Sequence, residues 1–221
     1  LGSYSDEVVV QHAQCVVLPD AVAFEEAACL SVPGATALRS FEVGGLAALP
    51  HGTARVLMLG ASGGVGLVTL QLARSLLGAK TVGVCSSRNV ALVEQQGATA
   101  LDYTRGDVLQ AARAHGPFDL IVHAVGSATY PLRACRALLA PRGAMAMVVV
   151  RPLDYPTLLF CPRITAVLGR PNRVNLEPVL AAMAKGELKV PIEKRLPLRD
   201  AEQAHQLSRA GKVVGKLLLI P

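Results

Sequence analysis

The middle of the chain alternates between short apolar runs and longer segments whose apolar residues recur every three or four positions. The runs predict buried strands, and the longer segments predict amphipathic helices. The expected strands cover residues 55–60, 80–85, 98–101, 118–123 and 143–149, and the expected helices cover residues 64–78, 88–96, 107–114 and 130–140. Such alternation is typical of a doubly wound parallel sheet, so the sequence predicts an α/β fold.

A glycine-rich turn joins the first expected strand to the first expected helix, in the run Gly60-Ala-Ser-Gly-Gly-Val-Gly66. A glycine at position 63 lets the backbone approach a pyrophosphate, and a glycine at position 66 lets the helix pack against the strand. The N–H groups at the helix start then face the anion. The turn therefore predicts a dinucleotide site, with an ordinary strand-to-helix turn as the alternative.

The segments on either side of this region follow other patterns. Residues 1–23 contain two short β-rich runs, and Pro33-Gly34 separates two expected helices, because proline and glycine interrupt helices. These β-rich runs cover residues 7–10 and 14–18, and the helices cover residues 24–30 and 36–41.

After the sheet region, the sequence predicts one more strand and a helix, and then a strand, a helix and a strand. These elements cover residues 164–168, 176–185, 190–196, 199–210 and 215–220. We expect the two strands of the tail to join the β-rich runs of residues 1–23. The chain would then leave one domain and return to it.

Composition describes a globular chain. Hydrophobic residues make up 52% and charged residues 17%, and no apolar run approaches the roughly 18 residues that a membrane span needs. The first residue is Leu1, so we expect the start to be a cut through a longer protein, with any targeting peptide outside this sequence. The formal charge is +6, but scattered basic residues and 4% aromatics predict no direct nucleic-acid binding.

The five cysteines are odd in number and widely spaced, at positions 15, 29, 85, 135 and 161. This usage predicts a soluble intracellular protein in a reducing compartment, without disulfides. The spacing also lacks the clustered Cys-x-x-Cys pairs of a structural zinc lobe, so we expect no metal site.

Several motifs together resemble one family. They are Gly2-Ser-Tyr-Ser, Phe24-Glu-Glu-Ala-Ala, Pro33-Gly-Ala-Thr-Ala37, the turn at 60–66, Gly97-Ala98, Asp102-Tyr103, Pro117-Phe-Asp-Leu120 and Gly211-Lys-Val-Val-Gly-Lys216. In this order they resemble the zinc-independent medium-chain dehydrogenase/reductases, nearest to quinone oxidoreductases of the mitochondrial reticulon-4-interacting and chloroplast envelope types. The resemblance implies a Rossmann domain at 36–187, and an incomplete, β-rich GroES-like substrate domain at 1–35 and 188–221.

The residues after the second expected strand bear on the choice of cofactor. This strand ends in Ser86-Ser-Arg88, without the carboxylate that accepts from the ribose of NAD. Hydroxyl groups and a guanidinium suit a 2′-phosphate, which favours NADPH. The alternative is that Ser86 caps the next helix and Arg88 is merely solvated.

The resemblance also implies roles for single residues. It puts Ser62, Gly64 and Val65, beside Gly63, at the pyrophosphate. It puts Tyr103 by the adenosine phosphate, Thr36 near the nicotinamide, and Val125 at the strand end over the cofactor. His123 is a weak candidate for a proton donor, because its ordinary pKa is near 6.5, and a structural histidine is the alternative.

The implied activity is NADPH-dependent hydride transfer to a quinone or to the β-carbon of an enone, with a proton from water or from a group outside this sequence. The resemblance favours the mitochondrial matrix and a homodimer that pairs through residues 143–149 or 164–168, since exposed sheet edges invite pairing. Two rival hypotheses are a nucleotide-binding subunit of a larger organellar assembly, with little or no catalysis, and a sensor of the NADPH/NADP⁺ ratio.

Overall fold

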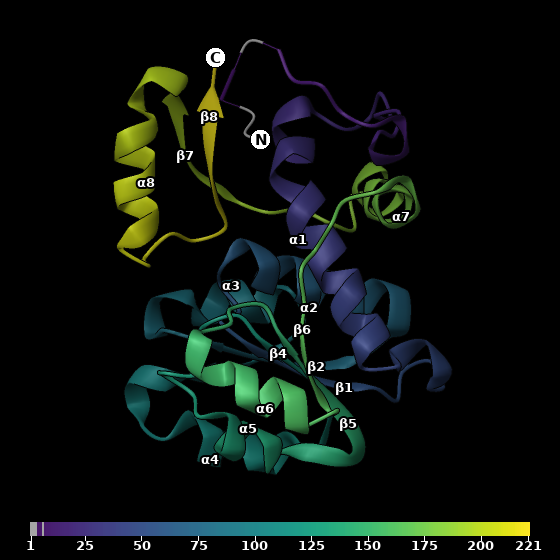
Figure 1. Ribbon diagram of the computed structural model, residues 1–221, viewed down its shortest axis with the longest axis vertical. Helices are drawn as coiled ribbons and strands as arrows, with labels where there is room; N and C mark the ends of the chain where they lie inside the picture. The colour runs from purple at the N-terminus through teal and green to yellow at the C-terminus, as the bar shows by residue number, and fades with distance from the viewer. Residues whose placement is uncertain (1–3, 6) are drawn as a thin grey trace.

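A six-stranded sheet forms the centre of the computed structural model, which describes residues 4–5 and 7–221 (Figure 1). The strands are β1 (Arg55–Leu59), β2 (Lys80–Cys85), β3 (Thr99–Asp102), β4 (Phe118–His123), β5 (Leu139–Met147) and β6 (Ile164–Ala166). They lie in the order β3-β2-β1-β4-β5-β6, and all neighbours are parallel. The predicted α/β fold with a doubly wound parallel sheet is confirmed.

Helices cover both faces of this sheet (Figure 1). They are α1 (Phe24–Val43), α2 (Gly64–Leu77), α3 (Val90–Gln95), α4 (Val108–Ala112), α5 (Leu132–Arg136), α6 (Tyr155–Phe160) and α7 (Arg173–Ala184). In β1, Val56 and Met58 pack into the core under α1, α2 and α7, whereas Leu57 and Leu59 pack into a second core with residues of α4 and α5. Successive side chains of a strand point to opposite faces, so a strand buried on both sides reads as a continuous apolar run.

The two helices expected at 24–30 and 36–41 are one helix, α1, and this prediction is wrong. Pro33 lies inside α1, although an interior proline costs about 3 kcal/mol. Residues on both sides of it are buried, and α1 approaches α7 so closely that a Cβ on Gly34 would lie 2.6 Å from Val179 Cγ2. Burial of one face along the whole helix outweighs the hydrogen bond that Pro33 removes.

The expected pairing of the tail with the N-terminal runs is also wrong. The tail forms β7 (Ile192–Pro197), α8 (Ala201–Arg209) and β8 (Lys216–Ile220), and β7 pairs with β8 in a separate two-stranded parallel sheet. Among described residues 4–5 and 7–23 there is no strand, and Val9 is 99% exposed. An apolar run becomes a strand only where a neighbouring strand takes up its backbone hydrogen bonds.

Smaller differences concern the lengths of elements. The helix expected at 130–140 is α5 alone, because β5 begins at Leu139, and the helix expected at 107–114 is α4 followed by a short 3-10 turn. The proline-punctuated region after residue 152 forms a 3-10 turn and α6. The expected domain boundary at residues 35 and 36 falls within α1.

Strand order also decides which strand is open for pairing with another copy. β5 lies between β4 and β6, and its residues 145–147 are already paired on both sides, so β5 is not an edge strand and that half of the dimer prediction is wrong. β6, which contains part of the other expected segment, is one of the two edge strands, and β3 is the other. In the part of the chain that the structure describes, no helix is long and apolar enough to cross a membrane.

Candidate functional site

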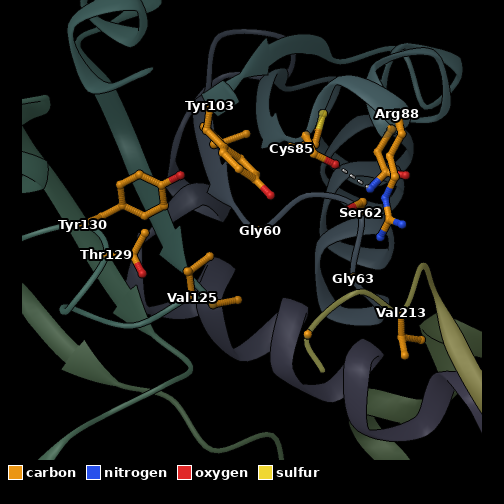
Figure 2. Close-up of a pocket in the computed structure, with 15 residues that line it drawn as sticks. Gly60, Ser62, Gly63, Cys85, Arg88, Tyr103, Val125, Thr129, Tyr130 and Val213 are labelled. Atoms are coloured by element: carbon orange, nitrogen blue, oxygen red, sulfur yellow. Dashed lines mark hydrogen bonds between the residues drawn. The ribbon is translucent and has the colours of Figure 1, made fainter. Parts of the chain in front are cut away.

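A cavity of about 510 Å³ opens where β1, β2 and β4 end at their carboxyl termini (Figure 2). Strand order reverses at β1, whose neighbours are β2 and β4, and ligands of open α/β sheets bind at such a switch point. The cavity is lined by Gly60, Ser62, Gly63, Val84, Cys85, Ser86, Arg88, Asn89, Tyr103, Ala124, Val125, Thr129, Tyr130, Gly211 and Val213. Six of the predicted site residues are therefore brought together here, namely Ser62, Gly63, Ser86, Arg88, Tyr103 and Val125.

The glycine turn forms the floor of this cavity, and its shape requires glycine at two positions. Gly60 has a φ of 91°, which side chains rarely adopt. A Cβ on Gly66 would lie 2.3 Å from Gly60 O, so α2 approaches the turn more closely than any other residue allows. Gly63 is the N-cap of α2, and no side chain of residues 4–5 and 7–221 caps the helix, which leaves its first N–H groups free for an anion.

Arg88 and Tyr103 lie at opposite sides of the cavity, and Figure 2 shows the Tyr103 hydroxyl directed toward its middle. Arg88 is exposed and donates to the backbone carbonyl of Lys212, in the loop before β8. Ser86 is at the N-cap of a 3-10 turn, but its hydroxyl accepts from Asn89 Nδ2 at 3.3 Å and caps no backbone N–H. The helix-capping alternative for Ser86 therefore has no hydrogen bond to support it.

Asp102, a carboxylate to which the sequence analysis assigned no role, directly precedes Tyr103 of the cavity lining. Asp102 ends β3, and it accepts hydrogen bonds from Ser87 Oγ and Thr104 N and pairs with Arg105 at 3.2 Å. The hydrogen bond from Ser87 holds the pKa of Asp102 below its ordinary value. Its negative charge is thus balanced locally, and Asp102 does not line the cavity.

His123 is buried at the end of β4, and both ring nitrogens have partners. Nε2 lies 3.0 Å from Tyr130 O, and Nδ1 accepts from Gly126 N at 3.3 Å. This arrangement fixes the tautomer with the proton on Nε2, and burial lowers the pKa of the imidazole. His123 does not line the cavity and orders the loop from Ala124 to Tyr130, so the geometry supports the structural alternative over a proton donor.

Three more predicted residues lie outside the cavity lining. Thr36 is buried in α1, where its hydroxyl donates to Val32 O at 2.8 Å, and the backbone of Gly169 packs against it. Gly64 and Val65 begin α2, so they offer backbone N–H groups rather than side chains. Their predicted roles at the cofactor stay predictions.

Lys216 is a residue that sequence reasoning did not assign to the site. Its side chain covers the start of α2, since a Cβ on Gly64 would lie 2.6 Å from Lys216 Cε. Burial lowers the pKa of Lys216, and no salt bridge to it occurs among residues 4–5 and 7–221. A positive charge beside free helix N–H groups adds to the attraction for an anion.

Cysteine and metal chemistry have little support at this site. Burial raises the pKa of Cys85 to about 11, so its thiol stays protonated near neutral pH and is a poor nucleophile. Over the described residues, no three side chains of His, Cys, Asp or Glu gather in a way that could hold a metal ion.

The chain is similar to several known oxidoreductases. It is 28% identical over 235 residues to the trans-enoyl reductase pgmF of Aspergillus terreus, covering 99% of this chain and 65% of that protein. It is 29% identical over 230 residues to a chloroplast envelope quinone oxidoreductase homolog of Arabidopsis thaliana, covering 100% and 69%. The solved quinone oxidoreductase of Coxiella burnetii superimposes with a TM-score of 0.80 at 25% identity, covering 92% of this chain and 63% of that structure.

These comparisons confirm the resemblance to quinone oxidoreductases. The chain spans 56% to 65% of the length of the fungal trans-enoyl reductases that it matches. The zinc-binding dehydrogenase family matches residues 96–219, which is more than half of the chain. By this match and these relatives, the chain belongs to the zinc-binding dehydrogenase family, within the medium-chain dehydrogenase/reductases.

Proposed function

We propose that this chain carries the NADPH site of an oxidoreductase that reduces quinones or activated C=C bonds without zinc. The observation that carries the proposal is the cavity at the switch point, with the start of α2 at its floor, Arg88 and Tyr103 at opposite sides, and Ser86 in its lining. The relatives support the acceptor classes, because one is a trans-enoyl reductase and others are quinone oxidoreductases.

In this proposal the first N–H groups of α2 and the ammonium of Lys216 bind the pyrophosphate. Gly63 brings the backbone close to it, because a side chain there would occupy the space. Arg88 binds the 2′-phosphate with its planar fork, and Ser86 donates a hydroxyl. When bound, NADPH supplies a hydride to the acceptor.

The preference for NADPH rests on the end of β2 and not on the relatives. An enzyme that selects NADH places a carboxylate there for the ribose hydroxyls, whereas this chain places Ser86 and the exposed Arg88. The nearby Asp102 is engaged by Ser87, Thr104 and Arg105, so it has no free oxygen directed at the cavity.

Two measurements test the proposal. Titration of the purified protein with NADPH and with NADH, followed by the fluorescence of the reduced nicotinamide, should give tighter binding of NADPH. Oxidation of NADPH should then accelerate with 1,4-benzoquinone or 2-cyclohexenone. Equal affinity for both nucleotides would contradict the role of Arg88, and absence of turnover with every acceptor would leave the rival hypothesis of a nucleotide-binding subunit.

We also propose a homodimer that forms through β6 and α6. β6 is one of the two edge strands of the sheet, and near it in sequence Leu159 is 77% exposed, Phe160 81% and Leu168 70%. A second copy would bury these apolar side chains and bond the open strand.

A location in the mitochondrial matrix rests on the family resemblance alone, and cell fractionation with an antibody against the protein tests it.

A further inference from the structure

A second cavity, of about 520 Å³, adjoins the one described above. Gly63, Ala124, Gly211 and Val213 line both. The side chains of the second cavity come from the N-terminal segment, from α8 and from β8, and they include Tyr4, His205, Ser208, Lys216, Leu217 and Leu219. One wall is thus polar and another apolar.

The proposed function fixes what this second cavity would hold, and the inference below rests on that function. Arg88 and Tyr103 line only the first cavity, and Gly63 stands at the junction. With the 2′-phosphate at Arg88 and the pyrophosphate at Gly63, the remaining half of the dinucleotide continues toward the second cavity. The acceptor must meet the nicotinamide there.

Tyr4 and His205 form a side-chain pair in the wall of this cavity. Tyr4 Oη lies 3.3 Å from His205 Nε2, and the two rings are 5.8 Å apart between centroids, inclined at 55°. Both side chains are exposed, and they are separated by 201 positions in the sequence. An imidazole that donates to a phenol oxygen leaves the phenol O–H free to donate elsewhere.

We propose that the Tyr4 hydroxyl binds the carbonyl oxygen of the acceptor and that His205 orients this hydroxyl. Tyr4 is then a catalytic residue, and His205 is a positioning residue. His123 cannot take this part, because Tyr130 O and Gly126 N occupy its two nitrogens. Lys216 also lines this cavity, but its side chain lies against Gly64 at the start of α2, where the proposed function assigns it to the pyrophosphate.

The chemistry of an enone explains why a donor is needed at this oxygen. A hydride from NADPH forms a C–H bond at the β-carbon, the electron pair of the C=C bond moves toward the carbonyl, and negative charge develops on the oxygen. A proton from water then completes the α-carbon. A hydrogen-bond donor placed at that oxygen stabilises the charge as it develops. A quinone gains the same charge on its oxygen, so the subsite serves both acceptor classes.

A binding experiment tests the subsite without turnover. Histidine ring signals are recorded by NMR for protein saturated with NADP⁺, before and after addition of 2-cyclohexenone, and His205→Gln identifies the signal of His205. We expect the enone to shift the His205 signal, and we expect a much smaller shift in Tyr4→Phe. The signal of the buried His123 serves as an internal reference.

Kinetics provide the second readout. Tyr4→Phe should lower kcat/KM for 2-cyclohexenone by about 10- to 100-fold, the range for loss of one hydrogen bond to a charged oxygen, with NADPH affinity within about twofold. His205→Ala should lower kcat in the same direction, and His205→Gln should restore part of it, because an amide still bonds the phenol. Gln206→Ala is the matched control, since Gln206 is exposed on the same helix and, among the residues that the structure describes, its side chain bonds only Glu202.

The two proposals fail in different ways. A wild-type protein that binds no NADP(H), or that turns over no acceptor, refutes the proposed function. An unmoved His205 signal, or full activity of Tyr4→Phe in a protein that does turn over, refutes only the subsite. A shifted His205 signal in a protein that turns over no acceptor supports binding of the enone beside Tyr4 and His205, and it contradicts the proposed oxidoreductase function.

Discussion

Alanine substitutions at two glycines of the same turn should affect different properties, namely stability at Gly66 and nucleotide binding at Gly63. At Gly66 a Cβ would lie 2.3 Å from Gly60 O and 2.5 Å from Ala61 O. Both neighbours are backbone atoms, so no side chain can turn aside, and α2 must move away from the turn. At Gly63 the nearest atom to an added Cβ is Gly60 O at 3.7 Å, which is an ordinary contact, and φ is −78°.

The magnitudes follow from these distances. Overpacking costs about 1–3 kcal/mol, and alanine returns up to about 1 kcal/mol through its higher helix propensity. We therefore expect Gly66→Ala to lower the free energy of unfolding by about 2 kcal/mol, or the melting temperature by about 4–8 °C for a chain of this size. Gly63→Ala should change stability by less than about 1 kcal/mol. Its methyl group would enter the space between the two cavities and weaken NADPH binding by about 10-fold or more.

Urea unfolding followed by circular dichroism measures the first effect, since the sequence has no tryptophan to report on unfolding. Nucleotide fluorescence measures the second. The reasoning is refuted if Gly66→Ala unfolds at the wild-type urea concentration, or if Gly63→Ala binds NADPH as tightly as the wild type does.

Three further predictions concern charge and assembly. Burial lowers the pKa of His123 in the folded state, so the unfolded chain binds the extra proton, and the free energy of unfolding falls as the pH drops below about 6.5, by at most about 1.4 kcal/mol per pH unit. Urea unfolding at several pH values should show a smaller dependence of this free energy on pH for His123→Gln, and an equal dependence would contradict the prediction. Arg88→Ala should weaken NADPH binding by about 10- to 100-fold and NADH binding by less than twofold; an equal loss for both nucleotides would mean that Arg88 acts only through Lys212. Phe160→Glu should halve the mass measured by light scattering, whereas the control Val9→Glu, at an exposed residue far from β6 in sequence, should leave the mass unchanged. A wild-type protein that is a monomer would refute the interface.

Local pattern predicted the strands of the main sheet well, because β1, β2 and β4 are buried on both faces over most of their length and are therefore mostly apolar. The glycine-rich turn could also be predicted from the sequence. Gly60 needs its backbone angle and Gly66 its close contact, and both constraints act within a few residues. Ser86 and Arg88 were candidates because they directly follow a predicted strand, whereas Tyr103 was a candidate because of the family resemblance.

Contacts between distant segments decided the rest. Pro33 stands in a continuous helix because α7 packs against α1 at Gly34. The apolar run at residues 7–10 forms no strand, since the tail strands pair with each other. The tertiary structure also shows that the hydroxyl of Thr36 donates to Val32 O within α1, while the role at the cofactor that the family resemblance implies for Thr36 stays a prediction.

By itself the sequence determined the class of the fold, the strand-turn-helix unit and the chemistry expected at its glycines, because each depends on neighbouring residues. Only the tertiary structure decided that Arg88 reaches Lys212, that Lys216 covers the start of α2, and that Tyr4 meets His205 in a second cavity. These pairs are separated by more than a hundred positions along the chain, and no local periodicity records which side chains a fold brings together.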